Sequence, residues 1–139
     1  MKILVAYFSQ TGNTKKVARQ IARKLGADMD EIKEKGKNDK KPGKDVQEIT
    51  YKKDPSKYDM VVIGSPVWAF RPPPVTRKYL SENKFRKTAF FCTYGLWTGF
   101  FFRGMKSASK EPVAKLKVHM KNVDNPGEKI DEFCRKIKG

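Results

Sequence analysis

Histidine and cysteine are scarce in this chain of 139 residues. The one histidine is His119, and the two cysteines, Cys92 and Cys134, lie far apart in the sequence without a Cys-x-x-Cys pair. Two such cysteines exclude a disulfide scaffold and a zinc site of ordinary ligand spacing. A single imidazole also argues against histidine metal ligation and against a histidine-dependent catalytic triad.

Long apolar runs are missing as well. None approaches the ~20 residues that a membrane-spanning helix needs. Residues 1–8 lead directly into polar residues without a small-residue cleavage site, so they do not resemble a signal peptide. We therefore expect a cytoplasmic protein that does not enter a membrane. Because apolar residues make up 38% of the chain and are clustered, we expect residues 1–139 to form one domain with its own core.

Acidic residues are the third shortage. The 15 Asp and Glu oppose 31 Lys and Arg, which gives a formal net charge of +16. Such a charge favours acidic partners, although a lysine-rich host proteome would produce the same excess without any partner. The basic residues are spread along the chain and form no single stripe, so we do not expect nucleic-acid binding.

Short apolar runs do occur, at residues 3–8, 60–63 and 89–92. Runs without polar alternation predict strands that are buried on both faces, as in a parallel sheet covered by helices. Residues 28–32 and 115–120 are half polar, and they predict edge strands with one face in water.

Helical spacing of apolar residues is found between those strands. We predict helices over residues 17–25, which Gly26 ends, over 75–80, from about 100 to 109, and over 130–137. Alternating strands and helices predict an α/β fold with right-handed crossovers.

Residues 33–57 are the weakest part of this pattern. They carry nine lysines together with glycines and prolines. Such a composition predicts a mobile loop with little helix, in its simplest form a solvated linker.

A polar turn follows the first predicted strand and precedes the first predicted helix. Backbone N–H groups at a helix N-terminus are unpaired and carry the positive end of the helix dipole. Gly12 permits close backbone approach or a positive φ there. We predict a neutral anion-binding turn suited to a phosphate monoester, with simple capping of the helix as the alternative. The candidate residues are Ser9, Gln10, Thr11, Gly12, Asn13 and Thr14.

This turn resembles the flavodoxin signature Ser/Thr-x-Thr-Gly-x-Thr, which holds the phosphate of flavin mononucleotide (FMN). Residues 59–69 and 89–95 are similar to the same family, and the resemblance spans nearly the whole chain apart from 33–57. It implies a single, doubly wound, open parallel five-stranded sheet of flavodoxin-like strand order 2-1-3-4-5, with FMN where the first and third strands end. All four defined positions of the signature match: Ser9, Thr11, Gly12 and Thr14.

Two further segments, residues 64–71 and 93–99, follow the next two central strands and are expected at the same edge of the sheet. Both tryptophans of the chain lie in them, and aromatic faces stack on flat ring systems. The resemblance makes Trp68 the leading stacking candidate and leaves Tyr94 or Trp97 for the other face; the alternative is that these aromatics only cover the core. The candidate residues are Ser65, Pro66, Val67, Trp68, Ala69, Phe70, Thr93, Tyr94, Gly95, Trp97 and Gly99.

The resemblance implies a short-chain, FMN-binding electron-transfer protein that carries one or two electrons between redox partners without a catalytic side chain. An alternative is an FMN-dependent NAD(P)H oxidoreductase acting on a quinone or another small acceptor, because Arg71 beside the ring segment could hold an anionic nucleotide. The basic surface predicts an acidic redox partner, a ferredoxin or an oxidoreductase. We expect the protein to be a monomer or a weak dimer.

Overall fold

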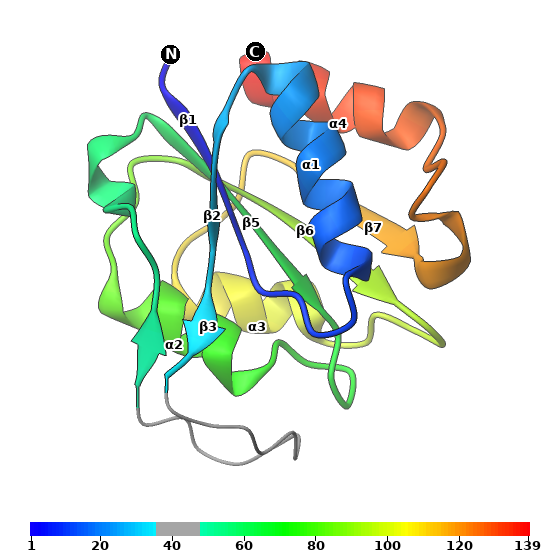
Figure 1. The fold of residues 1–139 in the computed structure, drawn as a ribbon, viewed down its shortest axis with the longest axis horizontal. Coiled ribbons are helices and arrows are strands. Elements are labelled where there is room, and N and C mark those ends of the chain that lie inside the picture. Colours follow the sequence, from blue (N-terminus) through cyan, green and yellow to red (C-terminus); the bar gives the residue numbers. More distant parts are fainter. Residues whose placement is uncertain (36–47) are drawn as a thin grey trace.

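The computed structural model describes residues 1–35 and 48–139. Its central sheet contains five parallel strands in the order β2-β1-β5-β6-β7 (Figure 1). Counted within this sheet alone, the order is 2-1-3-4-5, so the predicted topology and both predicted edge strands are confirmed. The strands are β1 (Ile3–Tyr7), β2 (Asp28–Glu31), β5 (Met60–Pro66), β6 (Thr88–Tyr94) and β7 (Lys115–His119).

Helices cover both faces of the sheet, and all four predicted helices are present. The apolar residues of α1 and α4 share one core with one face of the sheet, whereas those of α2 and α3 share a second core with the other face. The protein is therefore a doubly wound α/β fold. No helix within the described ranges is long and apolar enough to span a membrane. The helices are α1 (Asn13–Leu25), α2 (Pro74–Glu82), α3 (Phe101–Ala108) and α4 (Glu128–Lys138).

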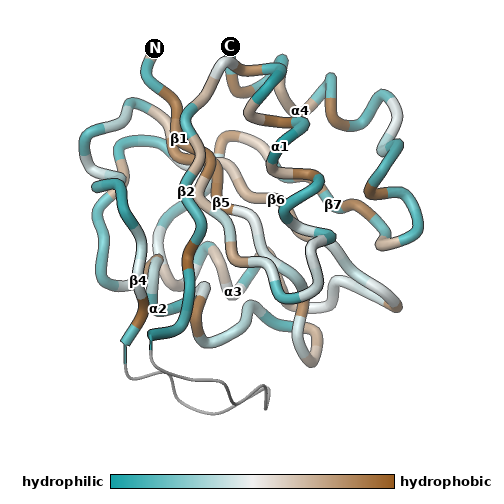
Figure 2. Tube along the Cα trace, viewed as in Figure 1, coloured by the Kyte–Doolittle hydropathy of each residue, from teal (hydrophilic) through white to brown (hydrophobic). Residues whose placement is uncertain are grey.

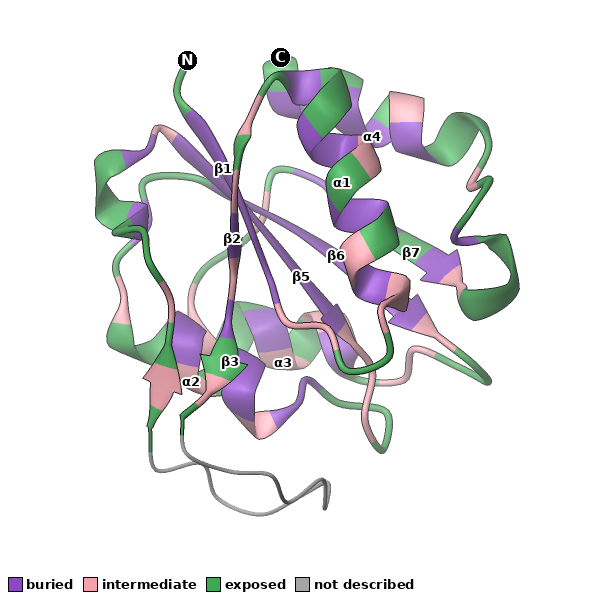
Figure 3. Ribbon diagram, viewed as in Figure 1, coloured by how far each residue is buried: buried purple, intermediate pink, exposed green. Residues whose placement is uncertain are grey.

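The apolar run of β1 follows from its position between the two cores. Ile3, Val5 and Tyr7 pack on the α1 and α4 side, and Leu4 and Ala6 pack on the α2 and α3 side. Since successive side chains of a strand point to opposite faces, a strand covered on both faces has no place for polar residues. Figure 2 shows hydrophobic residues gathered in the central strands, and Figure 3 shows that the same strands are buried.

The end of α1 is also determined locally. Gly26 adopts a left-handed conformation with φ 63° and ψ 39°, and the Ala27 N–H donates to the Ala22 carbonyl at 2.9 Å. A glycine that reverses the chain after the last helical turn satisfies carbonyls that would otherwise lack a donor. The predicted helix stop at Gly26 is confirmed.

The region 33–57 differs from the predicted loop. Its described parts contain two short antiparallel strands, β3 (Lys33–Glu34) and β4 (Ile49–Thr50), and a 3-10 helix at Pro55–Lys57. The buried Asp30 carboxylate organises this region, because it accepts the N–H groups of Lys52 and Lys53 at distances between 2.7 and 3.1 Å. Little helix is present, as predicted, but the strand pair was not foreseen. Mobility is predicted for the whole of 33–57 and stays a prediction, and residues 36–47 of this region lie outside the described residues.

Both cysteines are buried in the folded protein. Cys92 has no exposed surface, and burial raises the pKa of its thiol to about 12. Burial also raises the pKa of the Cys134 thiol. Because thiolates, not thiols, attack disulfide reagents, neither side chain has the properties of a redox-active cysteine.

We therefore predict that Cys92 reacts with an aromatic disulfide reagent at least about 100-fold more slowly in the native protein than in denaturant at pH 8. The variant Cys134→Ala isolates the Cys92 signal, and absorbance of the released thiolate measures the rate. A native rate equal to the denatured rate would contradict the burial of this thiol.

Candidate functional site

Three segments meet at the carboxyl edge of the sheet and enclose a pocket of about 170 Å³. The segments follow β1, β5 and β6, whose parallel direction brings their carboxyl ends to one edge. The predicted convergence of residues 9–14, 64–71 and 93–99 is thus observed. The pocket is lined by Gln10, Thr11, Asn13, Pro66, Val67, Trp68, Thr93, Tyr94, Gly95 and Met120.

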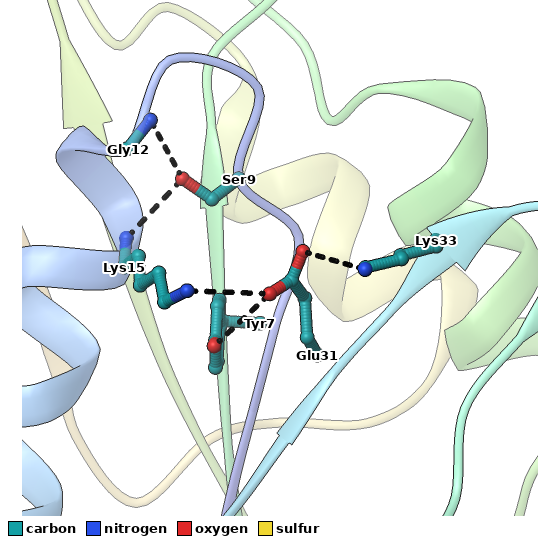
Figure 4. A network of polar contacts seen from close by, with 6 residues as sticks. All are labelled: Tyr7, Ser9, Gly12, Lys15, Glu31 and Lys33. Atoms are coloured by element: carbon teal, nitrogen blue, oxygen red, sulfur yellow. Dashed lines mark hydrogen bonds and ion pairs between the residues drawn. The ribbon is translucent and has the colours of Figure 1, made fainter. Parts of the chain in front are cut away.

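Ser9 closes the first turn instead of facing the pocket. Its hydroxyl oxygen accepts the N–H groups of Gly12 at 3.1 Å and Lys15 at 3.3 Å (Figure 4). Gly12 has φ 96°, and nothing lies within 4 Å of a Cβ built on it, so the position requires the left-handed backbone rather than close packing. Ser9 therefore satisfies a donor in the first turn of α1, whereas no Thr or Asn of the turn caps the helix as the alternative expected.

Donors remain available at the N-terminus of α1. The N–H groups of Asn13 and Thr14 belong to the first turn, where no helical carbonyl can accept them, and no other described residue does so. The side chains of Thr11 and Asn13 line the pocket without a hydrogen bond to any described residue. Neutral donors at the positive end of a helix form a suitable environment for a phosphate group.

Thr14 connects the first turn to β6. Its hydroxyl lies 2.8 Å from the hydroxyl of Thr93, and both residues are buried, with exposed fractions of 2% and 5%. One hydroxyl donates to the other, so this pair retains one O–H hydrogen for a further acceptor. The pair fixes the spacing between the turn after β1 and strand β6.

A carboxylate draws the nearby cations away from the turn. Glu31 accepts the Tyr7 hydroxyl at 3.4 Å, and its oxygens lie 3.8 Å from the Lys15 ammonium and 3.9 Å from that of Lys33 (Figure 4). Burial, and secondly the charge of Glu31, raises the pKa of Tyr7. Because Lys15 faces Glu31, the hydrogen-bond donors that remain at the turn are neutral.

Two aromatic rings form part of the pocket wall. Trp68 packs edge-on against Phe8, with ring centroids 5.5 Å apart at an interplanar angle of 74°. Tyr94 packs edge-on against His119, with centroids 5.3 Å apart at 86°. Edge-to-face contacts hold each ring in a defined plane. Of the two residues considered for the second stacking face, Tyr94 lines the pocket and Trp97 does not.

The segment after Trp68 contains a tight turn in an unusual conformation. Trp68 and Arg71 exchange two backbone hydrogen bonds of 2.9 Å, and the two residues between them, Ala69 and Phe70, have φ of 48° and 63°. Two successive left-handed residues are typical of Asn-Gly turns. Each non-glycine residue in this backbone conformation destabilises the folded state by about 1–3 kcal/mol. Strain of this kind is concentrated at ligand sites.

The third segment holds this turn in place. A Cβ at Gly99, whose φ is 54°, would lie 2.4 Å from the Cβ of Phe70, and the Phe100 N–H donates to the Phe70 carbonyl at 2.8 Å. Glycine is therefore required at position 99 both for its backbone conformation and for close approach.

Several predicted site residues do not line the pocket. The Ser65 hydroxyl is buried and lies 2.8 Å from the Thr76 hydroxyl, so its side chain is engaged with α2. Phe70 and Trp97 form an exposed aromatic pair beside the site, with exposed fractions of 41% and 59% and centroids 5.5 Å apart. The predicted residues outside the lining are Ser9, Gly12, Thr14, Ser65, Ala69, Phe70, Trp97 and Gly99.

Met120 is the one lining residue that sequence reasoning did not include. Its side chain lies over Gly95, since a Cβ built there would be 3.3 Å from the Met120 methyl carbon. Met120 follows β7, so the rule that parallel strands end at one edge would have identified it if applied to the edge strand too.

The pocket has little chemistry of its own. Its lining contains no carboxylate, thiol or amine. In residues 1–35 and 48–139, no group of three or more His, Cys, Asp or Glu side chains is placed to hold a metal ion. The arrangement offers neutral donors and aromatic surface, which suit an anionic, aromatic molecule.

The sheet is open and doubly wound, and a donor-rich turn and aromatic segments lie at its carboxyl edge. These features define an α/β protein with a cleft at the switch point of the sheet. The model of the Flavodoxin domain family matches residues 4–133, and the chain belongs to this family. No curated protein sequence matches the chain.

Solved structures share the fold at low sequence identity. A flavoprotein in complex with FMN from Lactobacillus acidophilus aligns over 95% of this chain and 97% of its own, with a TM-score of 0.74 and 21% identity. Oxidised flavodoxin 2 from Bacillus cereus aligns over 99% and 98%, with a TM-score of 0.66 and 19% identity. A flavodoxin from the domain Archaea aligns over 100% of both chains, with a TM-score of 0.59 and 20% identity.

Proposed function

We propose that residues 1–139 form one FMN-binding domain that carries electrons between redox partners. The observation that carries this proposal is the meeting of a neutral donor turn and two pocket-lining aromatic rings, Trp68 and Tyr94, at the carboxyl edge of a flavodoxin-type sheet. FMN combines a phosphate monoester with a flat ring system, and so matches both halves of the site. When bound, FMN supplies one- and two-electron chemistry.

The phosphate would be held by the turn after β1. The free N–H groups of Asn13 and Thr14 and the unpaired Thr11 side chain are its donors. Charge-assisted hydrogen bonds to phosphate are stronger than neutral ones, so these donors supply affinity even without a lysine. The Lactobacillus acidophilus flavoprotein, solved with FMN on the same fold, supports this choice of ligand.

The ring system would lie between Trp68 and Tyr94, partly in the open. The pocket of about 170 Å³ is smaller than the ~300 Å³ at the lower end of small-molecule sites, so it accommodates only part of the ligand. The remainder would extend out of the pocket into solvent. A partly exposed ring edge permits electron transfer to a docked protein. A lining without carboxylate, thiol or amine suits a carrier better than a self-sufficient enzyme.

The partner is proposed to be an acidic redox protein, such as a ferredoxin or an oxidoreductase. The net charge of +16 attracts an acidic surface over a distance of about 10 Å, the Debye length at ordinary ionic strength. Exposed aromatic side chains at the mouth of the site provide the short-range contact.

Titration of the purified protein with FMN tests the proposal. We expect saturation at one FMN per chain, with a changed visible absorption band near ~450 nm and quenched flavin fluorescence, because the cofactor carries the colour and the aromatic walls contact its ring. A spectrum that stays that of free FMN throughout the titration would refute FMN binding.

Trp68→Ala is predicted to weaken FMN binding about tenfold and to restore part of the flavin fluorescence, because it removes one stacking face. Fluorescence titration measures both effects. Trp97→Ala is the matched control: this tryptophan is 59% exposed and lies outside the pocket lining, so its removal should leave affinity within about twofold. Equal losses in the two variants would remove the distinction between the two tryptophans.

The second candidate function is NAD(P)H-dependent reduction of a small acceptor through FMN. The specific observation in its favour is Arg71, which ends the turn beside the ring site and is exposed. Steady NAD(P)H oxidation by the FMN-loaded protein alone would favour the reductase. Dependence of all turnover on an added reductase would favour the carrier.

A further inference from the structure

A second and larger cavity is lined by residues of α2, of α3 and of the segments that lead into them. Both helices lie on the same side of the sheet (Figure 1). Its volume is about 520 Å³. It shares no lining residue with the pocket at the carboxyl edge. The lining residues that matter here are Arg71, Pro72, Arg77, Phe100, Arg103 and Gly104.

The charges around this cavity are all of one sign. Three arginines line it, no carboxylate does, and none of the three forms an ion pair with another described residue. By contrast, Arg86 on the surface lies 3.3 Å from the Asp59 carboxylate. Three guanidinium groups around one hollow repel each other, and a bound anion converts that repulsion into attraction.

The cavity is also built, with a close-packed floor. A Cβ at Gly104 would lie 2.7 Å from the Cδ of Pro72, so glycine lets α3 approach the residues before α2. The guanidinium of Arg103 lies 5.4 Å from the ring centroid of Phe100, which restricts its position. The lining therefore combines three exposed arginines with apolar side chains and an aromatic ring.

We propose that this cavity binds a nucleoside phosphate. Guanidinium forks match phosphate oxygens in two-point hydrogen bonding, and Phe100 together with Pro72 offers apolar surface to a base. Its volume falls in the range of about 300–1,000 Å³ that is typical of small-molecule sites, whereas inorganic phosphate or pyrophosphate would leave most of it empty.

Backbone hydrogen bonds link this cavity to the pocket at the carboxyl edge of the sheet. Arg71 exchanges two hydrogen bonds with Trp68, and Phe100 donates its N–H to the carbonyl of Phe70. A ligand on Arg71 and Phe100 therefore contacts one end of the strained turn, Arg71, and a residue that is hydrogen-bonded to Phe70 within it. The proposal itself does not depend on FMN binding, because the two pockets have separate linings.

Isothermal titration of the full chain with ADP, in the presence of saturating FMN and physiological salt, tests this site. We expect Arg77→Gln and Arg103→Gln each to weaken ADP binding at least about tenfold, and Arg77→Lys to have a smaller effect because it keeps the charge but loses the fork. Arg23→Gln removes the same charge from the exposed face of α1 and should leave ADP affinity within about twofold.

Four results would overturn the proposal. Absence of ADP binding would do so, and an equal loss in Arg23→Gln would assign binding to diffuse charge. Pyrophosphate binding as tightly as ADP would show that the nucleoside contributes nothing. Citrate binding as tightly as ADP would show that the arginines bind carboxylates as well as phosphates. Carboxylates of that kind are found on an acidic protein.

Discussion

Valine at positions 11 and 14 together is expected to weaken FMN binding at least about 100-fold while changing riboflavin binding by no more than a few fold. Thr11 lines the pocket with an unpaired hydroxyl, and the Thr14–Thr93 pair retains one O–H hydrogen. Each is a donor to a charged acceptor in FMN, and riboflavin has no phosphate to accept from them. Fluorescence titration with both ligands measures the difference.

The structure shows why the single variants must accompany the double variant. Thr14→Val removes the partner of the buried Thr93 hydroxyl, which costs about 1–3 kcal/mol of stability whether or not a ligand is present. Thr11 is exposed and has no such partner, so Thr11→Val alone should weaken FMN binding with no loss of stability. Equal losses for FMN and riboflavin in Thr11→Val would contradict phosphate recognition by this turn.

The layers of the fold could be predicted because each is encoded locally. A strand covered on both faces must be apolar throughout, as β1 is, and the glycine that ends α1 is required by its own backbone conformation. The convergence of three segments at one edge then follows from parallel topology alone. The positions of the strands and their parallel direction together determine most of the residues that line the pocket.

Features that depend on contacts between distant segments could not be predicted. The strand pair β3–β4 relies on Asp30, whose carboxylate binds N–H groups of residues 52 and 53, and no periodicity records that contact. Ser65 was expected near the ligand, but its hydroxyl is engaged with Thr76 of α2. The strand extends to Pro66, so alternation of side chains along it decides which face Ser65 occupies.

The turn at Ala69 and Phe70 was hidden for a different reason. Neither residue type favours a positive φ, so the sequence carries no turn signal of the Asn-Gly kind. The conformation is maintained by its surroundings, namely the Trp68–Arg71 hydrogen bonds and the close contact with Gly99. The arginine cavity is similarly invisible in the sequence, because α2 and α3 contribute its residues from separate segments.

Gly64→Ala is expected to reduce the free energy of unfolding by about 3 kcal/mol, a large share of the 5–15 kcal/mol typical of a folded domain. A Cβ at position 64 would lie 1.9 Å from Cζ of Phe91 and 2.2 Å from its Cε1, so the added methyl group overlaps a ring that has no exposed surface. Phe91 is also the registered neighbour of Gly64 on β6, so the overlap cannot be relieved by a surface rotamer. Urea unfolding should show a lower midpoint with an unchanged slope.

Gly95→Ala is the matched control, because the atom nearest to its Cβ is the flexible methyl carbon of Met120 at 3.3 Å, and its cost should stay within about 0.5 kcal/mol. The double variant Gly64→Ala/Phe91→Leu should lose about 1 kcal/mol less unfolding free energy than the two single variants lose together. The smaller side chain at position 91 makes room for the added methyl group. Strict additivity would mean that Phe91 is not what excludes a side chain at position 64. Gly64→Ala should also weaken FMN binding, although Gly64 is not part of the pocket lining. The reason is that the Phe8 N–H donates to the Gly64 carbonyl at 3.0 Å, and Phe8 packs against the ring of Trp68.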